Sequence, residues 1–184
     1  NYFISPQGAS KFTLPVVSLN INENSLFDYN NGIYVGGIDF DTWRTANPTL
    51  TIPSKIGNFY REVNDEKRAN FSYFVNGQEV LNQDVGVRIR GNRSRLFENK
   101  SLTIYARSDY GDDTLDHKFF NDLSYTSFER ITLSVSGSDF YGTKFKDALC
   151  HQICKPLRVE IEAYQPNIAF INGEYWGLIQ TRER

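Results

Sequence analysis

Cysteine, histidine and methionine are scarce in this chain of 184 residues, which has two Cys, two His and no Met. Cys150 and Cys154 are spaced i and i+4 on an expected helix, where a disulfide between them would need unusual geometry. No second pair of ligands accompanies them, so a zinc site is not indicated, and we expect both thiols to be buried. No motif places a Ser or Cys nucleophile for His117 or His151, which argues against a triad hydrolase.

The chain also lacks a long apolar run and a strong excess of charge. No stretch approaches the roughly 20 apolar residues of a transmembrane helix, and a formal net charge of −2 gives no support for nucleic-acid binding. Asp109, Asp112 and Asp113 lack the spacing of a calcium loop and are interpreted as a solvated turn, so no metal site is predicted. Hydrophobic residues at 40% and charged residues at 23% are ordinary values for a folded domain.

Alternation of apolar and polar residues predicts a mainly antiparallel sheet. An aromatic share of 15% also favours β-structure. Asn76-Gly77 and Asn172-Gly173 are typical of two-residue hairpin turns, because both positions accept positive φ. The strand-like segments are residues 14–20, 32–36, 69–74, 79–81, 85–90, 101–107, 130–135, 158–164, 167–171 and 175–179.

One principal helix is expected between the strand at residues 130–135 and the strand at residues 158–164. Thr143 caps it, and it runs to about Lys155, where Pro156 ends it. Its positions at helical spacing, which predict a face packed on the sheet, are Phe145, Ala148, Leu149, Gln152 and Ile153. The fold class is therefore α+β, a mainly antiparallel sheet with one principal helix.

Three further segments are predicted with less regular structure. Residues 22–28 are expected to form a short helical turn, and residues 115–123 an irregular helix from which Phe119 and Phe120 pack inward. Residues 41–56 are expected to form a surface loop that Trp43 anchors to the body of the domain.

Basic side chains gather at one turn of the predicted sheet. Arg88 and Arg90 share the polar face of their strand, and a Gly/Ser/Arg loop from Gly91 to Arg95 follows it and includes Ser94. Guanidinium forks and loop N–H groups together suit a phosphate or a carboxylate. The alternative for Arg88 and Arg90 is that each is solvated and paired with an acid on the sheet, which contributes little to stability.

Lys100 has the same strand parity as Leu102 and Ile104, on the apolar side of the next strand. A lysine in that direction is costly to bury unless an acid or a bound anion accompanies it, and the alternative is that its long stem bends out to water. Asp147 on the expected helix, and Asp139 before it, are candidate acids for Lys100; the alternative for Asp147 is a solvated helix surface.

The same stretch resembles the central signature of the CotH kinase-like family of spore-coat and bacterial surface proteins. The matching residues are Ile89-Arg90, Gly91, Ser94-Arg95 and Lys100-Ser101. The resemblance continues in order along the chain, in residues 14–19, 26–28, 32–35, 105–111, 137–139, 145–149, 163–166 and 172–178. Lys146 stands where the family usually has Arg, so a bidentate contact is lost there.

The resemblance implies an atypical protein kinase that transfers phosphate from ATP, with Mg²⁺ or Mn²⁺, to Ser or Thr of a surface or coat protein. Lys100 would contact the nucleotide phosphates and the Gly91–Arg95 loop would close over them. The expected phosphate-binding residues are Lys100, Arg88, Arg90, Gly91, Ser94 and Arg95. An extracytoplasmic location, whether secreted, on the cell surface or in the spore coat, is implied as well.

Residues 1–184 are expected to form one CotH-like domain that is truncated at its C-terminal end. Kinase chemistry needs metal-binding acids and a base beyond the hinge, so we identify no catalytic residue and expect this part alone to be inactive. The alternative function is a non-catalytic secreted surface or adhesion module that binds anions through its basic loop. The oligomeric state is left open.

Overall fold

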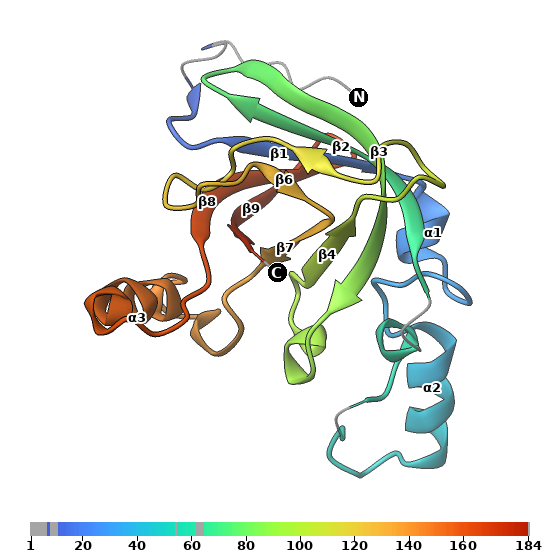
Figure 1. Cartoon of the computed structure of the whole chain (residues 1–184). Helices are drawn as coiled ribbons and strands as arrows, with labels where there is room; N and C mark the ends of the chain where they lie inside the picture. The colour runs from blue at the N-terminus through green and yellow to red at the C-terminus, as the bar shows by residue number, and fades with distance from the viewer. Residues whose placement is uncertain (1–6, 8–10, 54, 62–64, 184) are drawn as a thin grey trace.

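The computed structural model describes residue 7 and residues 11–53, 55–61 and 65–183. Seven strands form a closed barrel in the order β1-β2-β3-β4-β7-β9-β8 (Figure 1). They are β1 (Val16–Ile21), β2 (Lys67–Val75), β3 (Gln78–Arg90), β4 (Ser101–Tyr105), β7 (Arg130–Ser134), β8 (Tyr164–Ile171) and β9 (Glu174–Arg182). All neighbours pair antiparallel except β1 and β8, which are parallel. The predicted α+β class with a mainly antiparallel sheet is confirmed, and closure into a barrel is added.

Short helices and one small hairpin complete the fold. The α-helices are α1 (Glu23–Phe27), α2 (Gly37–Ala46) and α3 (Lys146–Cys154). The 3₁₀ turns are η2 (Asn58–Tyr60), η3 (Arg93–Leu96), η4 (Gly137–Asp139) and η5 (Lys155–Leu157), and β5 (Leu115–Asp116) pairs with β6 (Ser127–Phe128). Figure 1 shows α2 and α3 at the two sides of the lower end of the barrel. No helix in the described part of the chain is long and apolar enough to cross a membrane.

Both predicted hairpin turns are confirmed. Asn76 and Gly77 have φ of 53° and 76°, and Asn172 and Gly173 have φ of 52° and 85°, the left-handed values that the two-residue turn requires. The first turn leads into β3, a single strand of 13 residues where two short strands were expected. Most of β3 pairs with β2, and only its last residues, Gly86 to Arg90, pair with β4.

Alternate residues of the strands fill the barrel. Val17, Phe71, Val87, Ile104 and Ile131 are each at most 1% exposed and come from five different strands. The predicted inward packing of Phe119 and Phe120 is confirmed, and the Phe119 ring lies 4.9 Å from that of Tyr73. Because side chains alternate along a strand, Arg88 and Arg90 lie on the opposite face from this core.

Four sequence predictions of secondary structure are wrong. Residues 32–36 are not a strand: Ile33 and Tyr34 donate backbone hydrogen bonds to the carbonyls of Ser25 and Leu26, which docks them on α1. Residues 115–123 are not a helix, since β5 pairs with β6, which lies just beyond that segment. Residues 158–163 are not a strand, and residues 41–46 belong to α2. Helix α2 has no buried residue and therefore no apolar stripe to reveal it; Trp43 on it is only half-buried.

Helix α3 also differs from its prediction. It begins at Lys146, and Asp139 rather than Thr143 acts at its start, because Asp139 Oδ2 accepts from the Lys146 N–H (3.1 Å) and from Thr143 Oγ1 (2.7 Å). Only Ala148 of the expected apolar face is buried, whereas Leu149 and Ile153 are exposed. Cys150 is exposed and Cys154 half-buried, both as free thiols, so the expected burial is wrong. With ten residues in α2 and nine in α3, neither helix is the single principal one.

A buried polar chain inside the barrel offers a test of this fold. The Tyr73 hydroxyl donates to Asn167 Oδ1 (2.8 Å), and Asn167 Nδ2 donates to Thr181 Oγ1 (2.7 Å). Burial raises the pKa of Tyr73, so the hydroxyl stays protonated and can donate. We expect Tyr73→Phe to lower the free energy of unfolding by about 1 to 3 kcal/mol, because Asn167 Oδ1 is left buried without this donor. Urea denaturation measures it, with the exposed Tyr141→Phe as a control that should change little; equal stability of both variants would contradict the network.

Candidate functional site

A row of polar side chains crosses four strands on the face opposite the core. Arg88 on β3 lies opposite Thr103 on β4, Thr103 opposite Thr132 on β7, and Thr132 opposite Arg182 on β9. Thr103, Thr132 and Arg182 are at most 5% exposed, although they point away from the core. Buried polar groups need hydrogen-bond partners, so this row indicates a built polar surface rather than a solvated one.

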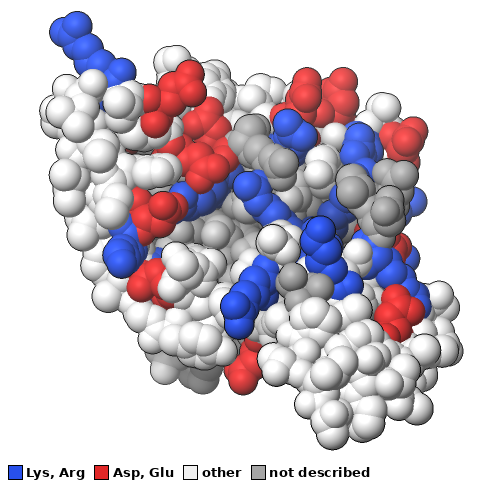
Figure 2. Space-filling view, turned by 90° about the horizontal axis from the view of Figure 1, so that it is seen from below, with Lys and Arg blue, Asp and Glu red and all other residues white. Residues whose placement is uncertain are grey.

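A hollow of about 260 Å³ lies at one end of this row. Asp65, hydroxyl groups and apolar groups line it, together with arginines from three segments, which are Arg61, Arg88 and Arg90 on β3, and Arg95. Figure 2 shows Lys and Arg side chains gathered across the middle of the face seen from below Figure 1. Among the described lining residues positive charge therefore exceeds negative charge, which suits an anionic ligand.

A second hollow, of about 240 Å³, adjoins the first at Arg90, which lines both. Arg182 faces it, and its Nη1 contacts Glu162 Oε2 at 2.7 Å and Asp147 Oδ2 at 2.5 Å. Thr132, Ser134, Ser136 and Ser138 add hydroxyl groups. The two hollows differ in charge balance, because the second brings two carboxylates against its two arginines.

The Glu66 carboxylate forms ion pairs with two arginines, one of which, Arg88, lines the first hollow. Its side chain is 8% exposed and accepts from Arg88 Nε at 2.8 Å and from Arg107 Nε at 2.7 Å. Burial alone would raise the pKa of Glu66, but the hydrogen bonds and charges of Arg107 and Arg88 outweigh it and lower that pKa. Gly86 makes room for the carboxylate, since a Cβ on Gly86 would collide with it. Glu66 therefore stays ionised and orients Arg88.

Arg90 is oriented by a hydroxyl across two strands. Its Nη1 donates to Thr132 Oγ1 at 2.8 Å. A guanidinium carries five N–H donors in a fixed fork, so this contact uses one donor and limits the directions in which the others point. Arg90 thereby stands between the two hollows, where an anion in either would meet it.

Arg95 ties the basic loop to the body of the protein. Its Nε donates to the Gly91 carbonyl at 2.7 Å and its Nη1 to the Phe59 carbonyl at 2.8 Å. Gly91 has φ of 117°, and a Cβ there would also collide with Ser94 Oγ. Burial lowers the pKa of Arg95. The loop is thus held over η2, with Arg95 partly engaged by backbone carbonyls.

Lys100 lies beneath the loop rather than in either hollow. It is 6% exposed, its Nζ donates to the Phe97 carbonyl at 2.7 Å, and the rings of Tyr34 and Phe59 lie 5.0 and 4.7 Å away. The prediction that the Lys100 side chain points to the apolar side of its strand is confirmed. The alternative, a side chain that bends out to water, is wrong. Burial lowers the pKa of Lys100 to about 8, because the charged form is desolvated there.

Comparison with known families identifies the chain. A family model described as CotH kinase protein matches residues 87–184, more than half of the chain. The chain belongs to the CotH kinase family. No curated protein matches it in sequence. The matched part of this CotH chain includes Arg88, Arg90 and Lys100, and it extends through α3 and β9.

Several predicted site residues of this CotH protein do come together. Arg88, Arg90 and Arg95 line one hollow, and Gly91 and Ser94 form the loop beside it. The predicted acids do not pair with Lys100 in this structure: Asp147 contacts Arg182, and Asp139 accepts from Thr143 and Lys146. The reason is that Lys100 points beneath η3, whereas α3 lies beside the outer face of β9.

Sequence reasoning missed four residues of the site: Arg61, Glu66, Glu162 and Arg182. Arg182 had a usable signal, because Gln180 and Arg182 continue the polar alternation of β9 beyond the point at which the predicted strand ended. Glu66 and Glu162 lie outside any recognisable motif. Arg61 is placed by a bidentate contact with Asp39, with distances of 2.6 and 2.7 Å, between segments that only the fold brings together.

The buried Lys100 predicts an unusual pH dependence of stability. Its folded pKa of about 8 lies below that of an unfolded lysine, about 10.4. Between these values the unfolded chain binds more protons, so raising the pH stabilises the fold. We expect the free energy of unfolding, relative to Lys100→Met, to rise by about 2 kcal/mol between about pH 7 and about pH 10.

Urea denaturation of both proteins at each pH measures this difference, and the Met variant removes the contribution of all other titrating groups. A difference that stays constant over the range would show that Lys100 keeps an ordinary pKa and is solvated.

Proposed function

We propose that this CotH domain takes part in phosphoryl transfer from ATP to Ser or Thr of a surface or coat protein, and that it supplies the phosphate-binding lobe. The hollow lined by Arg61, Arg88, Arg90 and Arg95 carries the proposal, and family membership supports it. Guanidinium forks match phosphate oxygens in pairs and neutralise charge that builds up on a transferring phosphoryl group.

Each basic residue has a distinct part in this proposal. Arg90 and Arg88 contact the phosphates, oriented by Thr132 and Glu66. Arg95, Gly91 and Ser94 shape the loop that covers them. Lys100 acts as a positioning residue beneath that loop, although the resemblance assigns it direct phosphate contact.

The metal that accompanies ATP is not assigned to any of the described residues. Among the described residues no group of three or more His, Cys, Asp or Glu side chains could hold a metal ion. No residue is therefore assigned as a metal ligand or as a catalytic base. The proposed location is extracytoplasmic, in keeping with the association of the CotH family with spore coats and cell surfaces.

Calorimetric titration with ATP, with and without Mg²⁺, tests the phosphate-binding role. We expect Arg90→Ala to weaken ATP binding about tenfold or more, because a charge-assisted contact is lost at the centre of the site. Arg93→Ala is the matched control: it removes the same charge three residues away, but Arg93 is exposed and lines neither hollow.

Lys100→Met separates the two assignments for that lysine. Direct phosphate contact predicts a loss as large as that of Arg90→Ala, whereas a positioning role predicts a smaller one. Phosphotransfer is then measured with the protein as its gene encodes it. ATP binding that is equally strong in Arg90→Ala and Arg93→Ala, or absent from that protein, would overturn the proposal and favour the non-catalytic surface module.

A further inference from the structure

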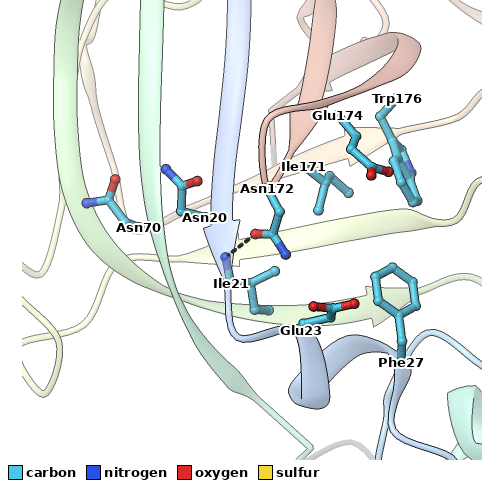
Figure 3. A pocket seen from close by; sticks show the side chains of 9 residues that line it. All are labelled: Asn20, Ile21, Glu23, Phe27, Asn70, Ile171, Asn172, Glu174 and Trp176. Carbon is cyan, nitrogen blue, oxygen red and sulfur yellow. Dashed lines mark hydrogen bonds between the residues drawn. The ribbon is translucent and has the colours of Figure 1, made fainter. Parts of the chain in front are cut away.

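A larger groove lies away from the arginines and has a different chemistry. Its volume is about 750 Å³, and it is formed where β1 ends, α1 begins and the β8–β9 hairpin turns. Three amides, two carboxylates, two aromatic rings and two aliphatic side chains line it (Figure 3): Asn20, Asn70, Asn172, Glu23, Glu174, Phe27, Trp176, Ile21 and Ile171. We propose that this groove binds a neutral saccharide. The proposal does not depend on the phosphoryl-transfer function.

A fixed aromatic wall closes one end of the groove. Figure 3 shows the rings of Trp176 and Phe27 together at that end, and their centroids are 6.3 Å apart. Trp176 Nε1 donates to the Tyr34 hydroxyl at 2.9 Å, and the Tyr34 ring packs edge-on against both rings. Tyr34 is buried, so the wall is ordered before any ligand arrives. Such a wall suits the C–H face of a sugar ring, which is apolar and flat.

The amides lie on the other side of the groove. Figure 3 shows Asn172, Asn20 and Asn70 in succession away from the rings. Asn172 Oδ1 accepts from the Ile21 N–H at 2.9 Å, which fixes this side chain at the hairpin turn. Asn20 Oδ1 is buried and has no hydrogen-bond partner among the described residues. Because this oxygen is out of reach of solvent, the contacts that Asn20 offers a ligand come from the rest of its side chain, which lines the groove.

Two carboxylates stand between the amides and the rings. Glu23 comes from the first turn of α1 and Glu174 from the start of β9, and both are exposed. The described lining residues include no Lys or Arg, so a phosphate or another anion would be repelled. Hydroxyl groups both donate and accept, and so they satisfy carboxylates and amides together.

The choice of ligand follows from the whole lining. A purely apolar ligand would desolvate the amides and carboxylates without compensation. A cation would suit Glu23 and Glu174 but cannot accept from the amide N–H groups. A neutral polyhydroxylated ring meets the aromatic, amide and carboxylate groups at once, in a groove within the range of about 300 to 1,000 Å³ for small-molecule sites.

Titration with defined oligosaccharides tests the proposal. The probes are cellotetraose, chitotetraose, maltotetraose and mannotetraose. Their binding is measured by calorimetry and by fluorescence. The chain has two Trp residues, so Trp43→Phe leaves Trp176 as the sole reporter. We expect saturable binding of at least one probe, with a change in Trp176 emission.

Matched variants connect this binding to the groove. Glu23→Ala/Glu174→Ala should weaken it about tenfold or more, because hydrogen bonds to two charged groups are lost. Glu160→Ala removes an exposed acid that does not line the groove and should leave it unchanged. Arg90→Ala should leave it unchanged too, so that failure of ATP binding and failure of saccharide binding are separate results. Circular dichroism verifies that each variant is folded.

Three outcomes would overturn the inference. One is the absence of binding for all four probes at millimolar concentration. Another is binding that is equal in the Glu23/Glu174 double variant and in Glu160→Ala. The last is a tetra-arginine peptide that binds more tightly than every oligosaccharide and loses affinity steeply with salt, which would identify a cation site instead.

Discussion

Parallel pairing between β1 and β8 is the contact on which the rest of the structure depends. Residues 16–19 pair with residues 168–171, and this joins the first strand to the last hairpin and closes the barrel. Closure removes both sheet edges and leaves only one interior. Because side chains alternate along each strand, a slip of one residue in any register would turn the apolar set outward and the arginines inward.

The barrel register places Arg88 and Arg182 on the outer face, and a charge that is buried there needs a carboxylate partner. Arg182 is almost fully buried, and an isolated charge in such a place would be very unfavourable. It is held by Glu162 and Asp147, as Arg88 is held by Glu66. Such pairs are weak evidence for stability, but they fix the orientation of the guanidinium groups. That orientation is what an anion-binding surface needs before its ligand arrives.

The basic hollows and the groove beside Trp176 use opposite chemistry on one barrel. The first presents arginines and hydroxyls, and the second presents amides, carboxylates and rings. Tyr34 connects their surroundings, since its hydroxyl accepts from Trp176 Nε1 and from the Lys100 N–H at 2.8 Å. Burial raises the pKa of Tyr34 and keeps this hydroxyl protonated. One buried residue thus helps to place both the aromatic wall and the start of β4.

The sequence by itself determined the features that depend on neighbouring residues. Period-two alternation identified the strands around Val87, Ile104 and Ile131, the Asn-Gly pairs identified both hairpins, and the ordered motifs identified the family. It also brought Arg88, Arg90 and Arg95 together, because they lie within eight residues of one another.

Contacts between distant segments were decided only by the tertiary structure. Residues 32–36 have strand-like composition but dock on α1, and α2 forms without an apolar stripe. Asp147 meets Arg182 instead of Lys100 because the closed barrel places α3 beside the outer face of β9. Local pattern cannot report such contacts, since the energy that selects them comes from packing and charge pairing across the whole chain.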